Sequence, residues 1–358
     1  MAVHCGESTG RRRVLTGAPG VATGLSLLSL LFGALAVWLL GSPAASAASA
    51  APATCRVGAY LSDLYDIDPA QHTFSARLHL WSVCDRKEDD PLPAASFTNA
   101  NDPEKSEPAL TSEGGRFRDL MRVQGVFRQD WDVRAFPFDR HRIEIVVTSF
   151  TDVEHFRFTP DNVHSAANEG IAPPGWRMSG FRLVTAEHRY PTNFGDPTLP
   201  RGMGSTHSRV IVQVDLARAD PVIFWKLTGP LYLMLLIGTA TFLLPSHSEE
   251  LGMAERLDTL QSRLALLGGG LFVVMLNMQQ VNVVVTSTVG LTLIDGLHLL
   301  TLCYVLVAVI GTVLSWRWTV RGGDPALAER HHHRGAFLGL VSYALLAAAM
   351  VGLAATVG

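Results

Sequence analysis

The C-terminal part of the chain holds apolar segments that are long enough to cross a membrane. A transmembrane helix needs about 20 apolar residues, and such segments lie at about 222–244, 262–282, 291–316 and 335–357. The sequence before them is polar with scattered charges. This contrast predicts a water-soluble domain over 51–219, followed by a membrane domain of four helices over 220–358.

The first 50 residues predict export of the domain that follows them. A basic group at 11–13 precedes an apolar stretch at 25–40, and small residues follow at 45–50. This order is typical of a signal peptide, here residues 1–50. The apolar stretch is long for a signal, so an uncleaved anchor is the alternative. In both cases the chain from about Cys55 onward is expected outside the cell.

The exported part has the periodicity of β-strands. Apolar and polar residues alternate at 74–80, 142–147 and 210–216, and turn residues separate these runs. Alternation of this kind is typical of strands with one face on a core and one in water. No long stretch of this part has helical periodicity. Short strands and turns over about 165 residues predict a β-sandwich.

Two cysteines, Cys55 and Cys84, lie in the part expected to be exported, where disulfides persist. They are placed symmetrically about a predicted turn at 68–71. If the strands on both sides of the turn form a hairpin, the two cysteines face each other at its open end. We therefore predict a Cys55–Cys84 disulfide, and two separate thiols are the alternative.

The topology of the membrane domain follows from the expected export. The first span then runs inward, and four spans return the C-terminus to the outside. The loop at 317–334 is expected inside and carries four arginines and three histidines, in agreement with the positive-inside rule. The loop at 245–261 is also expected inside but leans acidic, so the agreement is partial.

The second span is the least hydrophobic of the four. It contains three consecutive glycines at 268–270, which cost helix stability, and polar amides follow at 277–282. A helix shielded from lipid, or one that lines water, has such a composition. The alternative is that the glycines only allow close packing between helices.

Several function classes find no support in the sequence. A net charge of −3 does not favour nucleic acid as a partner. A nucleophile elbow, a zinc-binding helix motif and a phosphate loop are all missing from the sequence, so we expect neither an enzyme nor a cofactor. The tract His331–His333 is interpreted as solvated rather than metal-binding. His141, His155 and His164 have no ligand spacing and are interpreted as structural, although histidines can sense protons.

Many short segments resemble the pentameric ligand-gated ion channels, the Cys-loop receptor superfamily. They occur in the family's order and cover nearly all of the chain after the signal: 57–61 through 66–68, 73–74, 80–81, the Pro-Phe-Asp core within 134–139, 175–176, 190–193, 208–209, Arg218, Pro230 and 292–295. The signature loop lacks its two flanking cysteines, as in prokaryotic members. The second span is the part least similar to the family.

The resemblance implies a homopentamer, in which four further copies of the chain complete a ring around a pore. The second span would line this pore, because cyclic symmetry brings the same helix of each copy to the axis. A stripe at helical spacing would face the pore: Ala265, Gly269, Phe272, Leu276 and Gln279. The alternative is that this stripe packs against neighbouring helices. Acidic residues before the span (Glu249, Glu250, Glu255 and Asp258) lean toward cation selectivity.

The resemblance also implies a ligand site between adjacent exported domains. Tyr190 and Phe194 would lie at a capping loop, Phe156 on a facing strand and Trp81 on the hairpin. Aromatic faces attract organic cations, so a small amine is a candidate ligand. For each of these aromatic residues, a place in the core of the sandwich is the alternative.

Coupling between the two domains would depend on Asp68, Pro137, Phe138, Asp139 and Arg218, with an ion pair between Asp139 and Arg218. The alternative is that Pro137 and Asp139 merely shape a turn. The expectation is therefore an extracellular β-sandwich followed by a four-helix transmembrane bundle. It would form a ligand-gated or proton-gated ion channel in the plasma membrane, with lipid and permeant ions as further partners. A non-conducting receptor with a ligand-sensing β-domain is the other interpretation.

Overall fold

A computed structural model describes residues 51–197, 200, 202–243, 252–284 and 291–357. The predicted signal peptide, the acidic pair Glu249 and Glu250, and most of the predicted linker at 282–290 lie outside the described residues.

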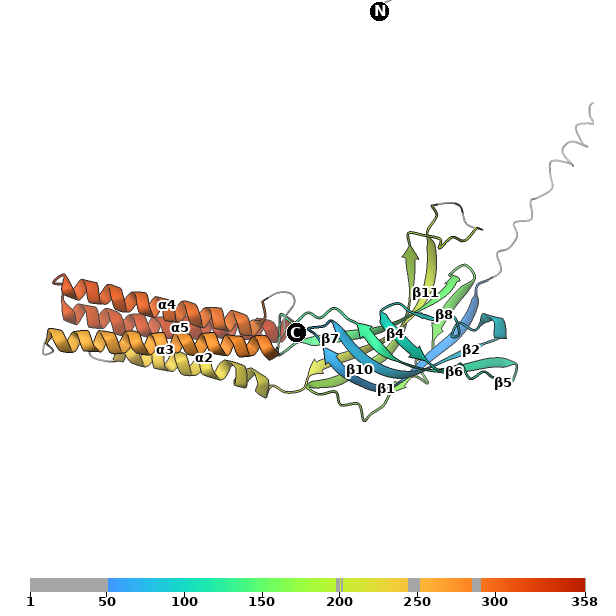
Figure 1. The fold of residues 1–358 in the computed structure, drawn as a ribbon, viewed down its shortest axis with the longest axis horizontal. Coiled ribbons are helices and arrows are strands. Elements are labelled where there is room, and N and C mark those ends of the chain that lie inside the picture. Colours follow the sequence, from blue (N-terminus) through green and yellow to red (C-terminus); the bar gives the residue numbers. More distant parts are fainter. Residues whose placement is uncertain (1–50, 198–199, 201, 244–251, 285–290, 358) are drawn as a thin grey trace, which may run out of the picture. The chain divides into compact units, whose positions relative to one another are not determined.

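Two sheets, in which most strands pair antiparallel, make up the N-terminal domain (Figure 1). The larger sheet has the strand order β4-β6-β2-β1-β8, with the short strands β5 and β9 added to β6 and β1. Among the described strands, β8 and β9 alone pair in parallel, both with β1. The bounds are β1 (Ala53–Asp68), β2 (Thr73–Cys84), β4 (Ala100–Lys105), β5 (Thr111–Glu113), β6 (Arg116–Arg128), β8 (Phe156–Pro160) and β9 (Ala166–Ala167).

The smaller sheet has the order β10-β11-β7-β3. Its register pairs apolar residues across strands, such as Val212 with Ile145 and Val214 with Ile143, and these side chains are buried. The predicted alternation thus gives a sandwich-like domain in which both sheets contribute to one core. The bounds are β3 (Ser96–Phe97), β7 (Arg140–Asp152), β10 (Trp176–Tyr190) and β11 (Ser205–Arg218), and a short 3-10 helix, η1, covers Lys87–Asp89.

The predicted disulfide joins Cys55 and Cys84, with an S–S distance of 2.05 Å. The register of β1 and β2 pairs Arg56 with Val83, which brings the two cysteines together at the open end of the hairpin. At the other end, the Asp68 carboxylate accepts hydrogen bonds from the backbone N–H groups of Ala70 (2.9 Å) and Gln71 (3.1 Å). The predicted hairpin and its Cys55–Cys84 disulfide are therefore confirmed.

Four helices follow the strands, and all four are long and apolar enough to cross a membrane. They are α2 (Val222–Ala240, continued by the 3-10 turn η2 at Thr241–Leu243), α3 (Met253–Val284), α4 (Leu293–Val320) and α5 (Pro325–Val357). They lie side by side in Figure 1, with α3 and α5 both next to α4.

Two helices begin earlier than their apolar stretches predict. α3 begins at Met253 rather than at about 262, and α5 begins at Pro325 rather than at about 335. The predicted inner loop at 317–334 is therefore largely helical, and its three histidines lie within α5. Proline is well tolerated in the first turn of a helix, because the N–H that it lacks would have no partner there.

Polar side chains form hydrogen bonds between the helices, where lipid offers no hydrogen-bond partner. The Asn277 amide of α3 donates to the Leu227 carbonyl of α2 (2.7 Å) and lies 3.0 Å from His298 Nε2 of α4. Hydroxyl pairs join Tyr304 of α4 to Thr239 of α2 (2.8 Å), and Thr301 of α4 to Tyr343 of α5 (2.9 Å). Such bonds hold apolar helices together in a membrane, because their alternative is an unsatisfied polar group in hydrocarbon.

Candidate functional site

A buried ion pair lies where the last strand leads into the first helix. The Asp139 carboxylate, only 1 % exposed, accepts a hydrogen bond from Arg218 Nε at 3.2 Å and lies 2.6 Å from His141 Nε2. Asp139 closes the loop at 134–139, which contains a cis Phe136–Pro137 peptide bond. Arg218 is the last residue of β11, so one carboxylate joins the loop, β7 and β11.

Aromatic rings surround this pair. The Arg218 guanidinium carbon lies 3.9 Å from the Trp176 ring centroid and 4.9 Å from that of Phe136. The His141 ring makes edge contacts with Trp131 (4.9 Å) and Trp176 (5.4 Å). Rings of this kind attract a cation and exclude water, so they strengthen the attraction between the charges that they enclose.

The ionisation of Asp139 reflects its partners. Burial alone raises the pKa of this carboxyl, but the hydrogen bond with His141 and the positive charge of Arg218 outweigh it and hold the pKa below its usual value. Asp139 is therefore a carboxylate at neutral pH, and its charge is matched by Arg218.

The loop at 134–139 also contacts the helices. The Phe138 ring packs on Phe224 in the first turn of α2, with centroids 5.4 Å apart. The backbone N–H of Leu293, the first residue of α4, donates to the Arg134 carbonyl at 2.9 Å. At this end of α4, Thr292 and Asp295 form a capping box, which leaves the Leu293 N–H pointing out of the helix start. A cavity of about 410 Å³ beside Pro137 and Arg218 reaches Ala355 near the end of α5.

Four of the five residues expected to couple the domains therefore lie together, namely Pro137, Phe138, Asp139 and Arg218. The fifth, Asp68, caps its own turn, and most of the linker expected beside it lies outside the described residues. From the sequence, His141 is interpreted as structural, with proton sensing as the alternative, and its contact with Asp139 is not predicted. Its spacing of two from Asp139 was a signal, since residues two apart on an extended strand lie on one face.

A second group of rings lies at the end of the β10–β11 hairpin. The Tyr190 ring is 5.1 Å from Phe194 and 5.4 Å from His207, and His188 lies 4.6 Å away on its own strand. Phe194 is 63 % exposed and has a positive φ of 52° in the segment that caps the hairpin. We call Tyr190, Phe194, His188 and His207 the capping cluster. The sequence predicted only its first two members.

The other two aromatic residues predicted to bind a ligand lie elsewhere. Phe156 is 4 % exposed and packs in the core against Phe158, as its alternative interpretation had it. Trp81 lies on β2, over Gly58 of β1, and donates from its indole N–H to Asp161 at 3.3 Å. Among the ring contacts of the described residues, neither side chain touches the capping cluster.

The predicted pore stripe lies on the exposed face of α3. Its members, Ala265, Gly269, Phe272, Leu276 and Gln279, are all exposed, and Phe272 is 64 % exposed. At about 100° per residue, they lie opposite the buried face formed by Leu267, Gly270, Val274 and Val281. The stripe thus does not pack against other helices of its own chain.

The three glycines of α3 have different surroundings. A Cβ on Gly270 would lie 1.7 Å from Met234 Sδ of α2, so the two helices approach closely at this point. At Gly268 and Gly269, on the exposed face, a Cβ would meet nothing within 4 Å. Close packing within the chain therefore explains Gly270. It does not explain Gly268 and Gly269.

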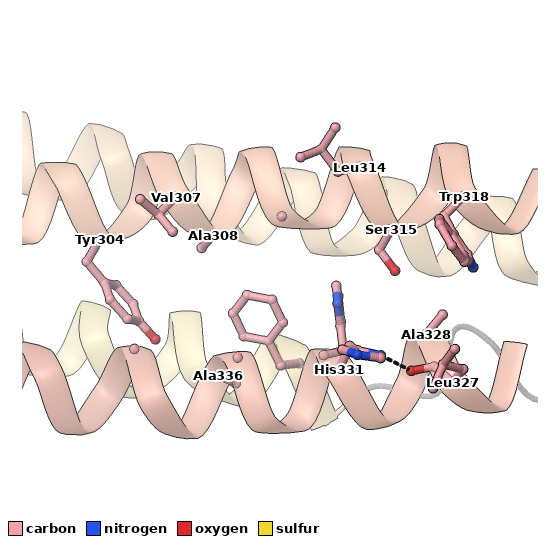
Figure 2. Close-up of a pocket in the computed structure, with 15 residues that line it drawn as sticks. Tyr304, Val307, Ala308, Leu314, Ser315, Trp318, Leu327, Ala328, His331 and Ala336 are labelled. Atoms are coloured by element: carbon pink, nitrogen blue, oxygen red, sulfur yellow. Dashed lines mark hydrogen bonds between the residues drawn. The ribbon is translucent and has the colours of Figure 1, made fainter. Parts of the chain in front are cut away.

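An apolar pocket of about 510 Å³ lies between α4 and α5 (Figure 2). Figure 2 shows Tyr304 at one end and Trp318 with Leu327 at the other. His331 and His332 line the pocket, and His332 is buried against Phe242 with ring centroids 5.0 Å apart. The interpretation of the histidine tract as solvated is therefore wrong for His332, which is buried, while His331 and His333 are exposed. The tract lies in a helix, one side of which faces the pocket.

Comparison with known proteins adds no family: no family model matches the chain, and no curated protein matches it either.

Proposed function

We propose that the chain is a subunit of a ligand-gated ion channel in the plasma membrane, and that five copies surround a pore lined by α3. The β-domain and the C-terminus would lie outside the cell. The observation that carries the proposal is the exposed face of α3, which is opposite the face that packs on α2 and α4. One chain cannot enclose a pore with one helix, whereas a ring of copies can.

The composition of this face supports a pore. Gly268, Gly269 and Gln279 are poor choices for contact with lipid, because glycine weakens a helix and an amide lacks partners in hydrocarbon. Phe272 and Leu276 would form apolar rings that close the pore by dewetting, and Gln279 would line its outer mouth. Glu255 and Asp258 at the inner end favour cations over anions, in a segment that also carries Arg256.

The ion pair at the end of β11 supports a route for gating. The β10–β11 hairpin runs from the capping cluster to Arg218. Arg218 holds Asp139, and the loop of Asp139 contacts the starts of α2 and α4. A ligand that moves the hairpin would therefore act on both helices that flank α3. His141 beside Asp139 makes protons a second candidate trigger.

A non-conducting receptor is the second candidate. It is favoured by the other exposed residues of α3, such as Leu266, Leu271 and Met275, which suit contact with lipid. The resemblance to pentameric channels concerns the order of many segments, and it favours the channel over this candidate.

The full chain, reconstituted in planar bilayers, tests the proposal. We expect currents when the pH is stepped or small ligands are added, with a reversal potential that follows the cation gradient. Phe272→Ser should increase the current without stimulus, because it adds polar groups to one of the two apolar rings proposed to close the pore. Leu346→Ser is the control, since Leu346 lies exposed on α5. Silence from a well-formed pentamer would favour the receptor, and a reversal potential that follows chloride would contradict cation selectivity.

A further inference from the structure

Arg209 lies beside the capping cluster, against Tyr190, and has no acidic partner among the described residues. Its Nη2 donates to the Tyr190 hydroxyl at 2.8 Å, and its guanidinium carbon lies 5.6 Å from the Tyr190 ring centroid. Its Nε is buried and has no hydrogen-bond acceptor in the part of the chain that the structure describes. A buried donor without an acceptor costs free energy, which an added acceptor can recover.

The surroundings of Arg209 are positive. The pKa of His188 is lowered by burial first, and then by the positive charges of Arg209 and His207. His207 is buried, with Nδ1 3.0 Å from the Ser149 carbonyl and Nε2 2.9 Å from Ser205 Oγ. The site therefore disfavours the addition of another positive charge.

The carboxylates closest in register have other partners. Asp152, which pairs with His207 across β7 and β11, accepts the backbone N–H groups of Glu154 and Thr206, both at 3.0 Å. Glu187 is bonded to Arg157.

We propose that the capping cluster binds a small organic anion, a carboxylate with an apolar or aromatic body, rather than an amine. This inference rests on the capping cluster being the ligand site of the proposed channel. Arg209 already occupies the face of Tyr190 that would attract an organic cation. A guanidinium pairs with a carboxylate through two parallel hydrogen bonds, and the exposed ring of Phe194 would cover the body of the ligand.

Calorimetric titration of the full chain in nanodiscs tests the proposal with two probes of similar shape and opposite charge, benzoate and benzylamine. We expect benzoate to bind and benzylamine to bind more weakly or not at all. Arg209→Gln should weaken benzoate binding by about 10- to 100-fold, because it removes a charge-assisted hydrogen bond. Arg209→Lys should lose less, since it keeps the charge but not the planar fork. Arg182→Gln is the matched control, because Arg182 lies on β10 and bonds Gln213 at 2.8 Å.

Three results would overturn the proposal: benzylamine that binds as tightly as benzoate, benzoate binding that Arg209→Gln leaves unchanged, or no binding of benzoate at millimolar concentration. Binding is measured without current, so the two proposals can fail separately. Benzoate that binds through Arg209 in a protein that never conducts would refute only the channel. A current opened by benzylamine but not by benzoate would refute only the proposal that the ligand is an anion.

Discussion

Replacing Asp139 by asparagine removes the carboxylate that joins Arg218 and His141, and leaves the cation without its counter-charge. Breaking a buried ion pair costs about 3–5 kcal/mol. We expect the lower end of this range, because the Arg218 side chain is 20 % exposed and keeps its contacts with Trp176 and Phe136. A loss of about 3 kcal/mol lowers the melting temperature of a domain of this size by about 10 °C.

Thermal unfolding of the full chain, followed by tryptophan fluorescence, measures this loss. Trp176 contacts the ion pair directly, so its emission reports on the site as well as on the domain. The matched control is Asp132→Asn, since Asp132 pairs with Arg134 at the start of the same loop and the two side chains are 58 % and 75 % exposed. Exposed pairs contribute less than about 1 kcal/mol. Equal shifts from the two variants would refute the account of the junction.

The dependence on pH gives an independent check. The pKa of Asp139 is lowered on folding. Its contribution to the free energy of unfolding is therefore complete above the unfolded pKa of about 3.9. It is lost only as the pH falls through the still lower folded value. The difference in melting temperature between wild type and Asp139→Asn should therefore not decrease from neutral pH down to about pH 5, because Asp139 stays ionised over this range. A difference that vanishes near pH 6 would contradict the assigned ionisation.

Three further perturbations test other parts of the structure. The pKa of Asp119 is raised to about 6, mainly by burial and then by the neighbouring Asp90. The unfolding free energy should therefore fall as the pH rises from about 4 to about 6, and Asp119→Asn should flatten this profile and raise the melting temperature at pH above 7. Gly270→Ala should destabilise the helices by about 1–3 kcal/mol through contact with Met234, whereas Gly269→Ala should not, as thermal denaturation in detergent can show. Cys84→Ser opens a disulfide that spans 29 residues and should cost about 3–4 kcal/mol in chemical unfolding of the full chain.

Each of these predictions has an outcome that would contradict it. If stability depended on pH in the same way with and without Asp119, the raised pKa of this carboxyl would be contradicted. Equal effects of alanine at Gly270 and Gly269 would show that α2 and α3 do not approach closely at Met234, and a double-mutant cycle with Met234→Ala measures this directly. Unchanged stability of Cys84→Ser under oxidising conditions would show that the disulfide is absent.

The fold could be predicted from the sequence where one periodicity dominates. Alternation at 143–147 and 210–216 is strong enough to give both strands, and the symmetry of Cys55 and Cys84 about one turn gives their pairing. Helix ends were less predictable, because hydropathy marks the apolar stretch and not the helix. α5 continues from that stretch through His331–His333 to Pro325, since its backbone bonds are internal and do not depend on lipid.

The candidate site could be predicted only in part. Asp139 and Arg218 are 79 residues apart in sequence, and only a resemblance to a known family suggested that they meet. The contact of Trp176 with His141 depends on the register of β10, β11 and β7, and Trp131 reaches His141 from the segment between β6 and β7; no local pattern specifies either. Arg209 was overlooked because its significance lies in having no acidic partner among the described residues, which only the three-dimensional arrangement of charges reveals.

The accessibility of Phe272 tests the central claim most directly. The full chain with Phe272→Cys, in a background where Cys5 and Cys303 are serine, is reconstituted in liposomes and treated on both sides with a charged thiol reagent. Val274→Cys, on the buried face, and Leu346→Cys, exposed on α5, are the controls. The account predicts that the reagent modifies Cys at position 272, and faster during activation, while both controls stay unmodified. A Phe272→Cys variant that reacts no faster than Leu346→Cys would mean that α3 faces lipid, and would contradict the pore.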